Sequence, residues 1–151
     1  MTVELITAAT PELHEAMGRL LPQLSRSAAP MSEADVERFL SQSSVHLFVF
    51  RAETADADGN NPILGMLSLA TFEIPTGVRA WVEDVVVDEA ARGQGAGLAL
   101  VEAAIEHAKT VGARTVDLTS RPTREAANRL YQRVGFQLRE TNVYRVTLEK
   151  K

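Results

Sequence analysis

The stretch WVEDVVVDEAARGQGAGLALVEAAIEHAKTVG, residues 81–112, decides the fold of this chain. It predicts a buried strand at residues 81–87, an acidic turn at 88–91, a glycine loop at 92–97 and a helix from 98 to about 111. A glycine loop between a strand and a helix directs free backbone N–H groups and the positive end of the helix dipole at one place. The stretch therefore predicts a site for an anionic group such as a phosphate.

The loop Arg92-Gly93-Gln94-Gly95-Ala96-Gly97 differs from two other phosphate-binding loops. A Walker loop ends in Gly-Lys-Ser/Thr, whereas Leu98 and Ala99 follow here. A dinucleotide fingerprint has the spacing Gly-x-Gly-x-x-Gly, and the third glycine of this chain comes one position early. Asp117 lies at the distance of the ribose-binding acid, but inside the next apolar run. A nucleotide-binding oxidoreductase therefore stays open as an alternative.

The loop resembles motif A of the GNAT superfamily, the acyl-CoA-dependent N-acetyltransferases, whose signature is Gln/Arg-x-x-Gly-x-Gly/Ala. Arg92, Gly95 and Gly97 match this signature position by position. The resemblance implies that the loop amides bind the pyrophosphate of coenzyme A, and that the preceding strand bonds the pantetheine arm through Val85 and Val87. The expected cofactor-binding residues are Val85, Val86, Val87, Arg92, Gly93, Gln94, Gly95, Ala96, Gly97, Arg124 and Asn128.

The segment Leu130-Tyr131-Gln-Arg-Val-Gly135-Phe136 resembles the second motif of the same family. The resemblance implies that Tyr131 donates a proton to the leaving thiolate; the alternative is that Tyr131 only faces the core of an amphipathic helix. The family has an asparagine seven residues before this tyrosine, where this chain has Arg124. Either Asn128, one helical turn before Tyr131, takes that place, or Arg124 pairs with a phosphate.

Glu83 and Asp84 are charges inside an apolar strand, where burial is costly unless a function or a partner compensates. An amine must lose a proton before it attacks a thioester, so a carboxylate within reach, directly or through water, suits the chemistry. Glu83 is the expected base, with Asp84 as the alternative. Strand alternation places Glu83 on the face of Trp81, Val85 and Val87, unless a bulge shifts the register.

Composition limits the class of protein. The 151 residues suffice for a single domain over residues 1–151, and the absence of cysteine excludes disulfides and an acyl-cysteine intermediate. Neither the three histidines nor any Cys/His spacing predicts a metal site. With no long apolar run and no signal-like N-terminus, we expect a cytoplasmic protein without a membrane partner.

Charge is divided unevenly along the chain. Residues 1–91 carry 5 basic and 14 acidic side chains, residues 92–133 carry 7 and 4, and residues 134–151 carry 4 and 2. The basic part coincides with the expected phosphate site. We expect no nucleic-acid partner, because no broad basic face with interleaved aromatic residues is present. The acidic first half, where the family shapes its acceptor pocket, indicates a cationic acceptor.

The sequence predicts an α/β (α+β) fold: a GNAT-like mixed, mostly antiparallel twisted sheet of about seven strands, with four helices packed on its faces. Apolar spacing and turn residues predict helices after Thr10, after Ser32, from residue 98 and before Gly135. Strands are expected at residues 3–6, 45–51, 63–74, 81–87, 114–118, 136–138 and 143–148.

Together these patterns predict an N-acetyltransferase in which a primary amine attacks acetyl-CoA directly, with Glu83 as base and Tyr131 as general acid. The acceptor stays open: a small amine, an amino sugar, an antibiotic, a polyamine or a peptide N-terminus all fit. A non-catalytic acyl-CoA sensor is the second alternative. An exposed edge strand near the C-terminus allows a homodimer.

Overall fold

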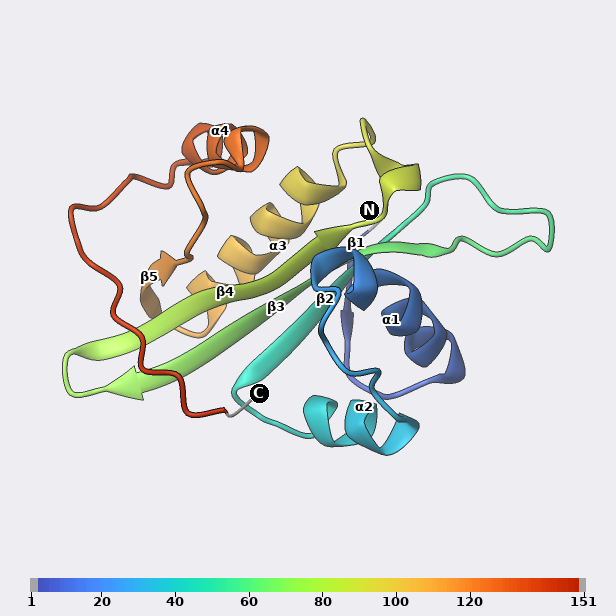
Figure 1. The fold of residues 1–151 in the computed structure, drawn as a ribbon, viewed down its shortest axis with the longest axis horizontal. Coiled ribbons are helices and arrows are strands. Elements are labelled where there is room, and N and C mark those ends of the chain that lie inside the picture. Colours follow the sequence, from blue (N-terminus) through green and yellow to red (C-terminus); the bar gives the residue numbers. More distant parts are fainter. Residues whose placement is uncertain (1–2, 150–151) are drawn as a thin grey trace. The chain divides into compact units, whose positions relative to one another are not determined.

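The sheet is formed by residues far apart in the sequence. The computed structural model describes residues 3–149. Neighbouring strands are antiparallel from the first to the fourth, and the last pair is parallel. Figure 1 shows the strands as one twisted layer. Within the described residues the sheet order is β1 (Val3–Ile6), β2 (Val45–Arg51), β3 (Ile63–Ile74), β4 (Gly77–Val87) and β5 (Ala113–Asp117).

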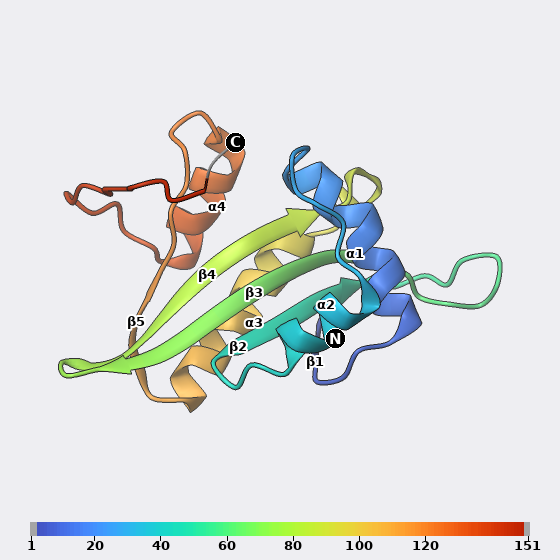
Figure 2. The same cartoon turned by 60° about the horizontal axis from the view of Figure 1, so that its bottom comes forward.

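Helices α1 (Pro11–Leu24) and α2 (Glu33–Leu40) cover one face of this sheet (Figure 2). Their apolar stripes join strand residues in one buried cluster, because side chains four positions apart on a helix share a face. The cluster contains Leu13, Ala16, Met17, Leu20, Val36, Leu47, Val49, Ile63, Met66 and Val86.

The starts of both helices are as the sequence predicts. The Thr10 hydroxyl accepts a hydrogen bond from the Leu13 N–H at 3.1 Å, and Pro11 occupies the first turn of α1. Ser32 and Asp35 form a capping box, in which each side chain accepts from the other residue's backbone N–H. These caps satisfy N–H groups that a helix leaves unpaired and so fix where each helix begins.

Helix α3 (Ala96–Thr110) covers the opposite face of the sheet, where it contacts β2, β3, β4 and β5 (Figure 2). The side chains on this face of the sheet alternate along each strand with those on the α1 and α2 face. Phe48 of β2 and Leu67 of β3, which pair across the two strands, are both buried. Helix α3 begins two residues before the predicted position 98. Ala96 and Gly97 therefore belong to the helix rather than to the loop.

The chain divides after Thr119 into two compact units. The first holds the sheet, α1, α2, α3 and the short 3-10 turn η1 (Glu89–Ala91). The second holds α4 (Glu125–Val134), which ends at Gly135 with φ +119°, a left-handed conformation that favours glycine. The single domain over residues 1–151 stays a prediction.

The two C-terminal strands predicted at residues 136–138 and 143–148 are wrong, so the described sheet has five strands instead of about seven. Alternating apolar residues show that a segment suits a strand, but they do not supply a neighbour with free backbone groups. In this segment apolar side chains of both alternations are exposed, so neither face is buried. The exposed side chains are Leu138, Val143, Tyr144, Val146 and Leu148.

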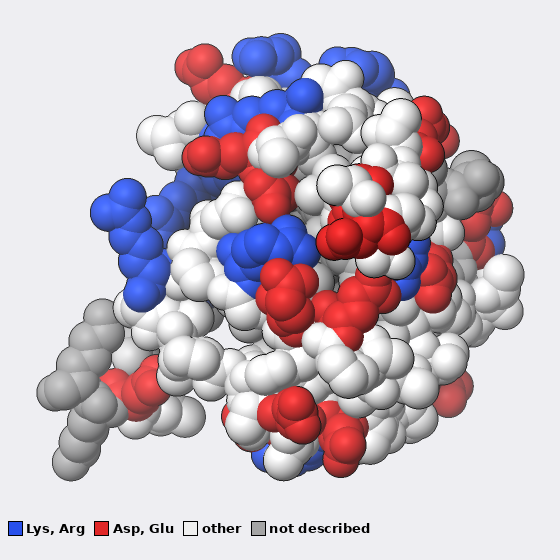
Figure 3. All heavy atoms as spheres, turned by 90° about the vertical axis from the view of Figure 1, so that its right-hand side faces the viewer, with Lys and Arg blue, Asp and Glu red and all other residues white. Residues whose placement is uncertain are grey.

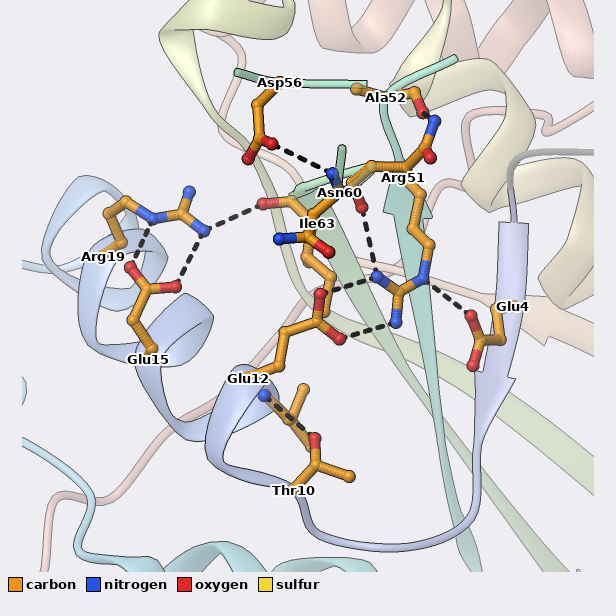
Figure 4. Close-up of polar contacts among 12 residues, drawn as sticks. Glu4, Thr10, Glu12, Glu15, Arg19, Arg51, Ala52, Asp56, Asn60 and Ile63 are labelled. Atoms are coloured by element: carbon orange, nitrogen blue, oxygen red, sulfur yellow. Dashed lines mark hydrogen bonds and ion pairs between the residues drawn. The ribbon is translucent and has the colours of Figure 1, made fainter. Parts of the chain in front are cut away.

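Arg51 fastens α1 to the sheet edge (Figure 4). Its guanidinium donates to Glu4 of β1 at 2.8 Å and to both carboxylate oxygens of Glu12 of α1 at 2.8 and 2.9 Å. It also donates to the backbone carbonyl of Asn61 at 3.2 Å. One planar fork thus joins two strands, a helix and the β2–β3 loop, and the hydrogen bonds from Arg51 lower the pKa of Glu12.

Candidate active site and cofactor loop

A β-bulge interrupts β4 at the residues predicted to carry the chemistry. Glu83 pairs with Ser68 and Val86 pairs with Met66, so two residues of β4 lie opposite one residue of β3. Asp84, inside the bulge, has φ +48°, which is the left-handed region. Holding a non-glycine residue there costs about 1–3 kcal/mol, although aspartate tolerates it better than most residues.

The bulge changes which side chains share a face. Trp81 and Glu83 pair with Ala70 and Ser68 and lie on the side of α1 and α2, whereas Val87 pairs with Gly65 and lies on the other side. Regular alternation would put Glu83 and Val87 on one face. That expectation is wrong here. The reason is the β-bulge, which the sequence left open as an exception.

Glu83 and Asp84 are both exposed. Their position in an apolar strand suggested a cost of desolvation. That cost is absent, because both carboxylates face solvent at the bulge. Neither carboxylate has a side-chain hydrogen bond or an ion pair among the residues that the structure describes. Both carboxylates are thus open to a ligand in solvent.

The loop after η1 presents backbone N–H groups to solvent. Gly93 and Gly95 have φ +84° and +74°, conformations that favour glycine, and Gly95 forms the start of α3 without a side-chain cap. Between residues 3 and 149 no hydrogen-bond partner is found for the N–H groups of residues 95–98. The first turn of α3 contains no acidic residue. This end of α3 is suited to an anion.

Buried alanines fix both ends of the loop. Ala91 is 1% exposed and Ala96 is 2% exposed, so the loop is anchored in the core on either side. Between them Arg92, Gly93, Gln94 and Gly95 are exposed. The Arg92 side chain lies 3.9 Å from Glu89, which is a weak surface pair, and it is exposed beside the loop.

The second unit carries the remaining predicted residues on α4. Tyr131 is 8% exposed and packs edge-on against Phe136, with ring centroids 5.9 Å apart. Burial raises the pKa of Tyr131, and the positive charge of Arg124 lowers it in part. The phenol is therefore protonated at neutral pH, which is the form that a general acid requires.

Arg124 and Asn128 occupy the start of α4. Arg124 is the N-cap residue of α4, and its side chain makes no capping hydrogen bond. The Asn128 side-chain amide donates to the Arg121 carbonyl at 3.0 Å. Asn128 thus bonds its own segment, while the Arg124 guanidinium is exposed. The predicted site residues form two groups, one on β4, the glycine loop and α3, and one on α4.

Acidic side chains gather on the first unit. Figure 3 views the side on which α1 and the β2–β3 loop lie in Figure 1, and carboxylates spread over much of that surface. Among residues 3–149 no group of three His, Asp or Glu side chains is placed to hold a metal ion. None of the helices in that range is long and apolar enough to cross a membrane.

Sequence reasoning missed the residues that hold the acidic turn. The Asp88 side chain starts η1 by accepting from the Ala90 N–H at 3.0 Å, and Arg19 of α1 donates to its other oxygen at 3.0 Å. The partners are distant in the sequence, and no motif contains both. Only the folded chain places α1 beside the turn that precedes the glycine loop.

Comparison with known proteins identifies the family. The model of the Acetyltransferase (GNAT) family matches residues 12–136, which include both groups of site residues. A relative described as an uncharacterized N-acetyltransferase, from Methanocaldococcus jannaschii, is 39% identical over 61 residues. The match spans 40% of this chain and only 27% of that protein.

Solved structures of acetyltransferases share the fold. An acetyltransferase from Trypanosoma brucei is 27% identical, with a TM-score of 0.74 and coverage of 97% of this chain and 99% of its own. An aminoglycoside acetyltransferase from an uncultured soil metagenomic sample, solved with sisomicin, is 18% identical, with a TM-score of 0.80 and coverage of 98% and 95%.

Proposed function

Because the chain belongs to the GNAT acetyltransferase family, we propose that it transfers an acetyl group from acetyl-CoA to a primary amine. The observation that carries this proposal is the row of unpaired N–H groups at residues 95–98, at the start of α3. Such a row binds diphosphate oxygens by hydrogen bonds and by the helix dipole. Gly93 and Gly95 keep the approach to these amides free of side chains.

The residues present fit coenzyme A. The diphosphate would lie against residues 93–98, with Arg92 adding a positive charge, and the pantetheine arm would follow β4 at Val85, Val86 and Val87. The thioester supplies an activated acetyl group when it is bound. Arg124 at the start of α4 is a second cation for a phosphate, and Asn128 is the alternative contact for the arm.

Glu83 is the proposed base. Its carboxylate is exposed on the α1 and α2 side of β4 and has no partner among the described residues that would compete for it. It would take the proton from the ammonium form of the acceptor, directly or through water, so that the neutral amine attacks the thioester carbonyl. Asp84, next in the chain and also exposed, is the alternative base.

Tyr131 is the proposed general acid. Its protonated phenol would give a proton to the sulfur as the carbon–sulfur bond breaks, which avoids the release of a free thiolate. A raised pKa keeps that proton in place at neutral pH. The chain contains no cysteine, so direct attack of the amine is the simpler route than an acyl-cysteine intermediate.

The proposed acceptor is a cationic amine. The excess of carboxylates in residues 1–91 would raise the local concentration of cations near β4. The metagenomic protein of similar fold is described as an aminoglycoside acetyltransferase and was solved with sisomicin. Asp35 is engaged in the capping box and with Arg38, whereas Glu33 and Glu37 are exposed; we expect neutralising these two to reduce activity on cationic amines alone.

The experiment is a screen of amines with acetyl-CoA that follows the release of free thiol. A non-catalytic acyl-CoA sensor would bind coenzyme A and release no thiol with any amine, and an oxidoreductase would bind a nicotinamide nucleotide instead. Release with amines of one class supports the proposal, and no binding of coenzyme A would contradict it. Cytoplasmic location and a homodimer stay predictions.

A further inference from the structure

Helix α1 contacts the turn that precedes the glycine loop. Arg19 donates from Nη1 to Asp88 Oδ2 at 3.0 Å, and Gln23 Oε1, one helical turn later, accepts from the Glu89 N–H at 3.3 Å. The Asp88 side chain is only 15% exposed, so this ion pair is screened less than a surface pair. Two side chains of α1 therefore hold the start of η1.

Asp88 determines the direction in which the chain leaves β4. Its N–H donates to the Leu64 carbonyl at 2.8 Å, and its Oδ1 accepts from the Ala90 N–H at 3.0 Å. The turn ends at buried Ala91, whose carbonyl accepts from the Gln94 N–H at 3.1 Å. The glycine loop is thus built on a turn whose capping carboxylate is shared with Arg19.

Arg19 is itself fixed in place. Its Nε donates to Glu15 Oε1 at 3.0 Å and its Nη2 donates to the Ile63 carbonyl at 3.1 Å (Figure 4). A guanidinium carries its donors in one rigid plane, so contacts to Glu15 and Ile63 leave Nη1 aimed at a single point. That point is Oδ2 of Asp88.

Resting on the proposed binding of acetyl-CoA, we propose that Arg19 is a positioning residue for the diphosphate site. By holding Asp88 in its capping orientation, Arg19 fixes η1 and hence the direction of the N–H groups at residues 95–98. Loss of Arg19 would let the loop sample other conformations and would reduce the fraction of molecules ready to bind the cofactor. The amine and its base on β4 would be unaffected.

The test compares two arginines that both fasten α1 to the sheet. Arg19→Gln removes two ion pairs, to Asp88 and Glu15, and Arg51→Gln removes two others, to Glu4 and Glu12, that do not touch the glycine loop. Calorimetric titration with coenzyme A measures affinity without turnover, and steady-state kinetics give KM for each substrate. Melting temperatures ensure that every titration is run on folded protein.

We expect Arg19→Gln to raise the dissociation constant for coenzyme A by about three- to tenfold, in the lower part of the range of coupling within one hydrogen-bond network. KM for acetyl-CoA should rise by a similar factor, with kcat and KM for the amine little changed. Arg51→Gln should lower the melting temperature and leave the affinity for coenzyme A unchanged. Asp88→Asn should weaken coenzyme A binding as much as Arg19→Gln does. The double variant should bind coenzyme A no more weakly than either single variant.

Two results would overturn the inference. One is an Arg19→Gln protein that binds coenzyme A as wild type does. The other is equal weakening by Arg51→Gln, which would make Arg19 a general support of α1. If Arg19→Gln does not fold, the affinities of Asp88→Asn and Arg51→Gln for coenzyme A are compared instead, with the same two outcomes. Failure of wild type to bind coenzyme A would instead refute the proposed function.

Discussion

The imidazole rings of His46 on β2 and His107 on α3 pack against each other, with centroids 4.3 Å apart and planes inclined by 53°. The Nε2 atom of His46 is 3.1 Å from the Thr71 hydroxyl, whereas the buried Nε2 of His107 has no hydrogen-bond partner among the described residues. Phe48 lies edge-on to His107. Burial, together with the neighbouring His107, lowers the pKa of His46.

This pair predicts a loss of stability in mild acid. The pKa of His46 is lower in the folded chain than its value of about 6.5 when unfolded, so the unfolded chain takes up a proton first. The stability that depends on neutral His46 is complete above about pH 6.5 and is lost as the pH falls toward the folded pKa. Urea unfolding at pH 7.5 and at pH 5 measures the difference.

His107→Leu is the variant that isolates this effect. It removes the imidazole next to His46, including a ring nitrogen that has no partner among the described residues, and leucine suits a helix. We expect its free energy of unfolding at pH 7.5 to stay within about 1 kcal/mol of wild type, with a smaller loss at pH 5. An unchanged acid loss in the variant would show that His107 does not contribute to it and that burial of His46 or other groups cause it.

Arg51→Gln should destabilise the first unit. The change leaves Glu4 and Glu12 without their shared partner and removes a bond to the Asn61 carbonyl. We expect a loss of about 1.5–3 kcal/mol, the range for hydrogen bonds to charged groups. Arg38→Gln is the control, since its pair with Asp35 is more exposed and should contribute less than about 1 kcal/mol. Similar losses in both variants would contradict the bracing role of Arg51.

The positive φ of Asp84 in the bulge allows the two candidate bases to be told apart by mutation. Asp84→Gly relieves the positive φ of Asp84, so we expect stability to be kept or raised by up to about 1 kcal/mol. With Glu83 as base, Asp84→Gly should retain kcat/KM, while Glu83→Gln should lower it by about 10²- to 10⁴-fold. Kinetics with a cationic amine decide between them. The reverse order would assign the base to Asp84.

Tyr131→Phe should reduce kcat by about 10²-fold or more, because it removes the hydroxyl group that carries the acidic proton and keeps the ring. The raised pKa of Tyr131 adds a pH signature: the acid is active while protonated, so its activity should persist up to at least about pH 10 and fall above that value. Tyr144→Phe is the control, since Tyr144 is exposed. Equal kcat in wild type and Tyr131→Phe would reduce Tyr131 to a packing residue.

Local signals in the sequence were sufficient for much of the first unit. Thr10, Ser32 and Asp35 satisfy N–H groups of their own helices, so a few neighbouring residues contain the whole interaction. The glycines at 93 and 95 likewise adopt the left-handed conformation that their loop requires. Such features can be read from the sequence because both partners lie within one turn of each other.

Interactions between distant segments were not readable. The bulge at Asp84 depends on how β3 pairs with β4, and regular alternation therefore placed Val87 on the wrong face. The C-terminal apolar residues have the period of a strand, but strand formation also requires a neighbouring edge. The contact between Arg19 and Asp88 depends on the packing of α1, for which no short motif exists.

The central claim, a diphosphate site at the start of α3, is tested most directly by coenzyme A titration of Gly97→Asp and Gly97→Asn. Both side chains have nearly the same shape, and an aspartate in a first helical turn favours the helix while it repels phosphate. We predict that Gly97→Asp melts at or above the temperature of Gly97→Asn and binds coenzyme A at least about tenfold more weakly. Equal affinities of the two folded variants would contradict the claim.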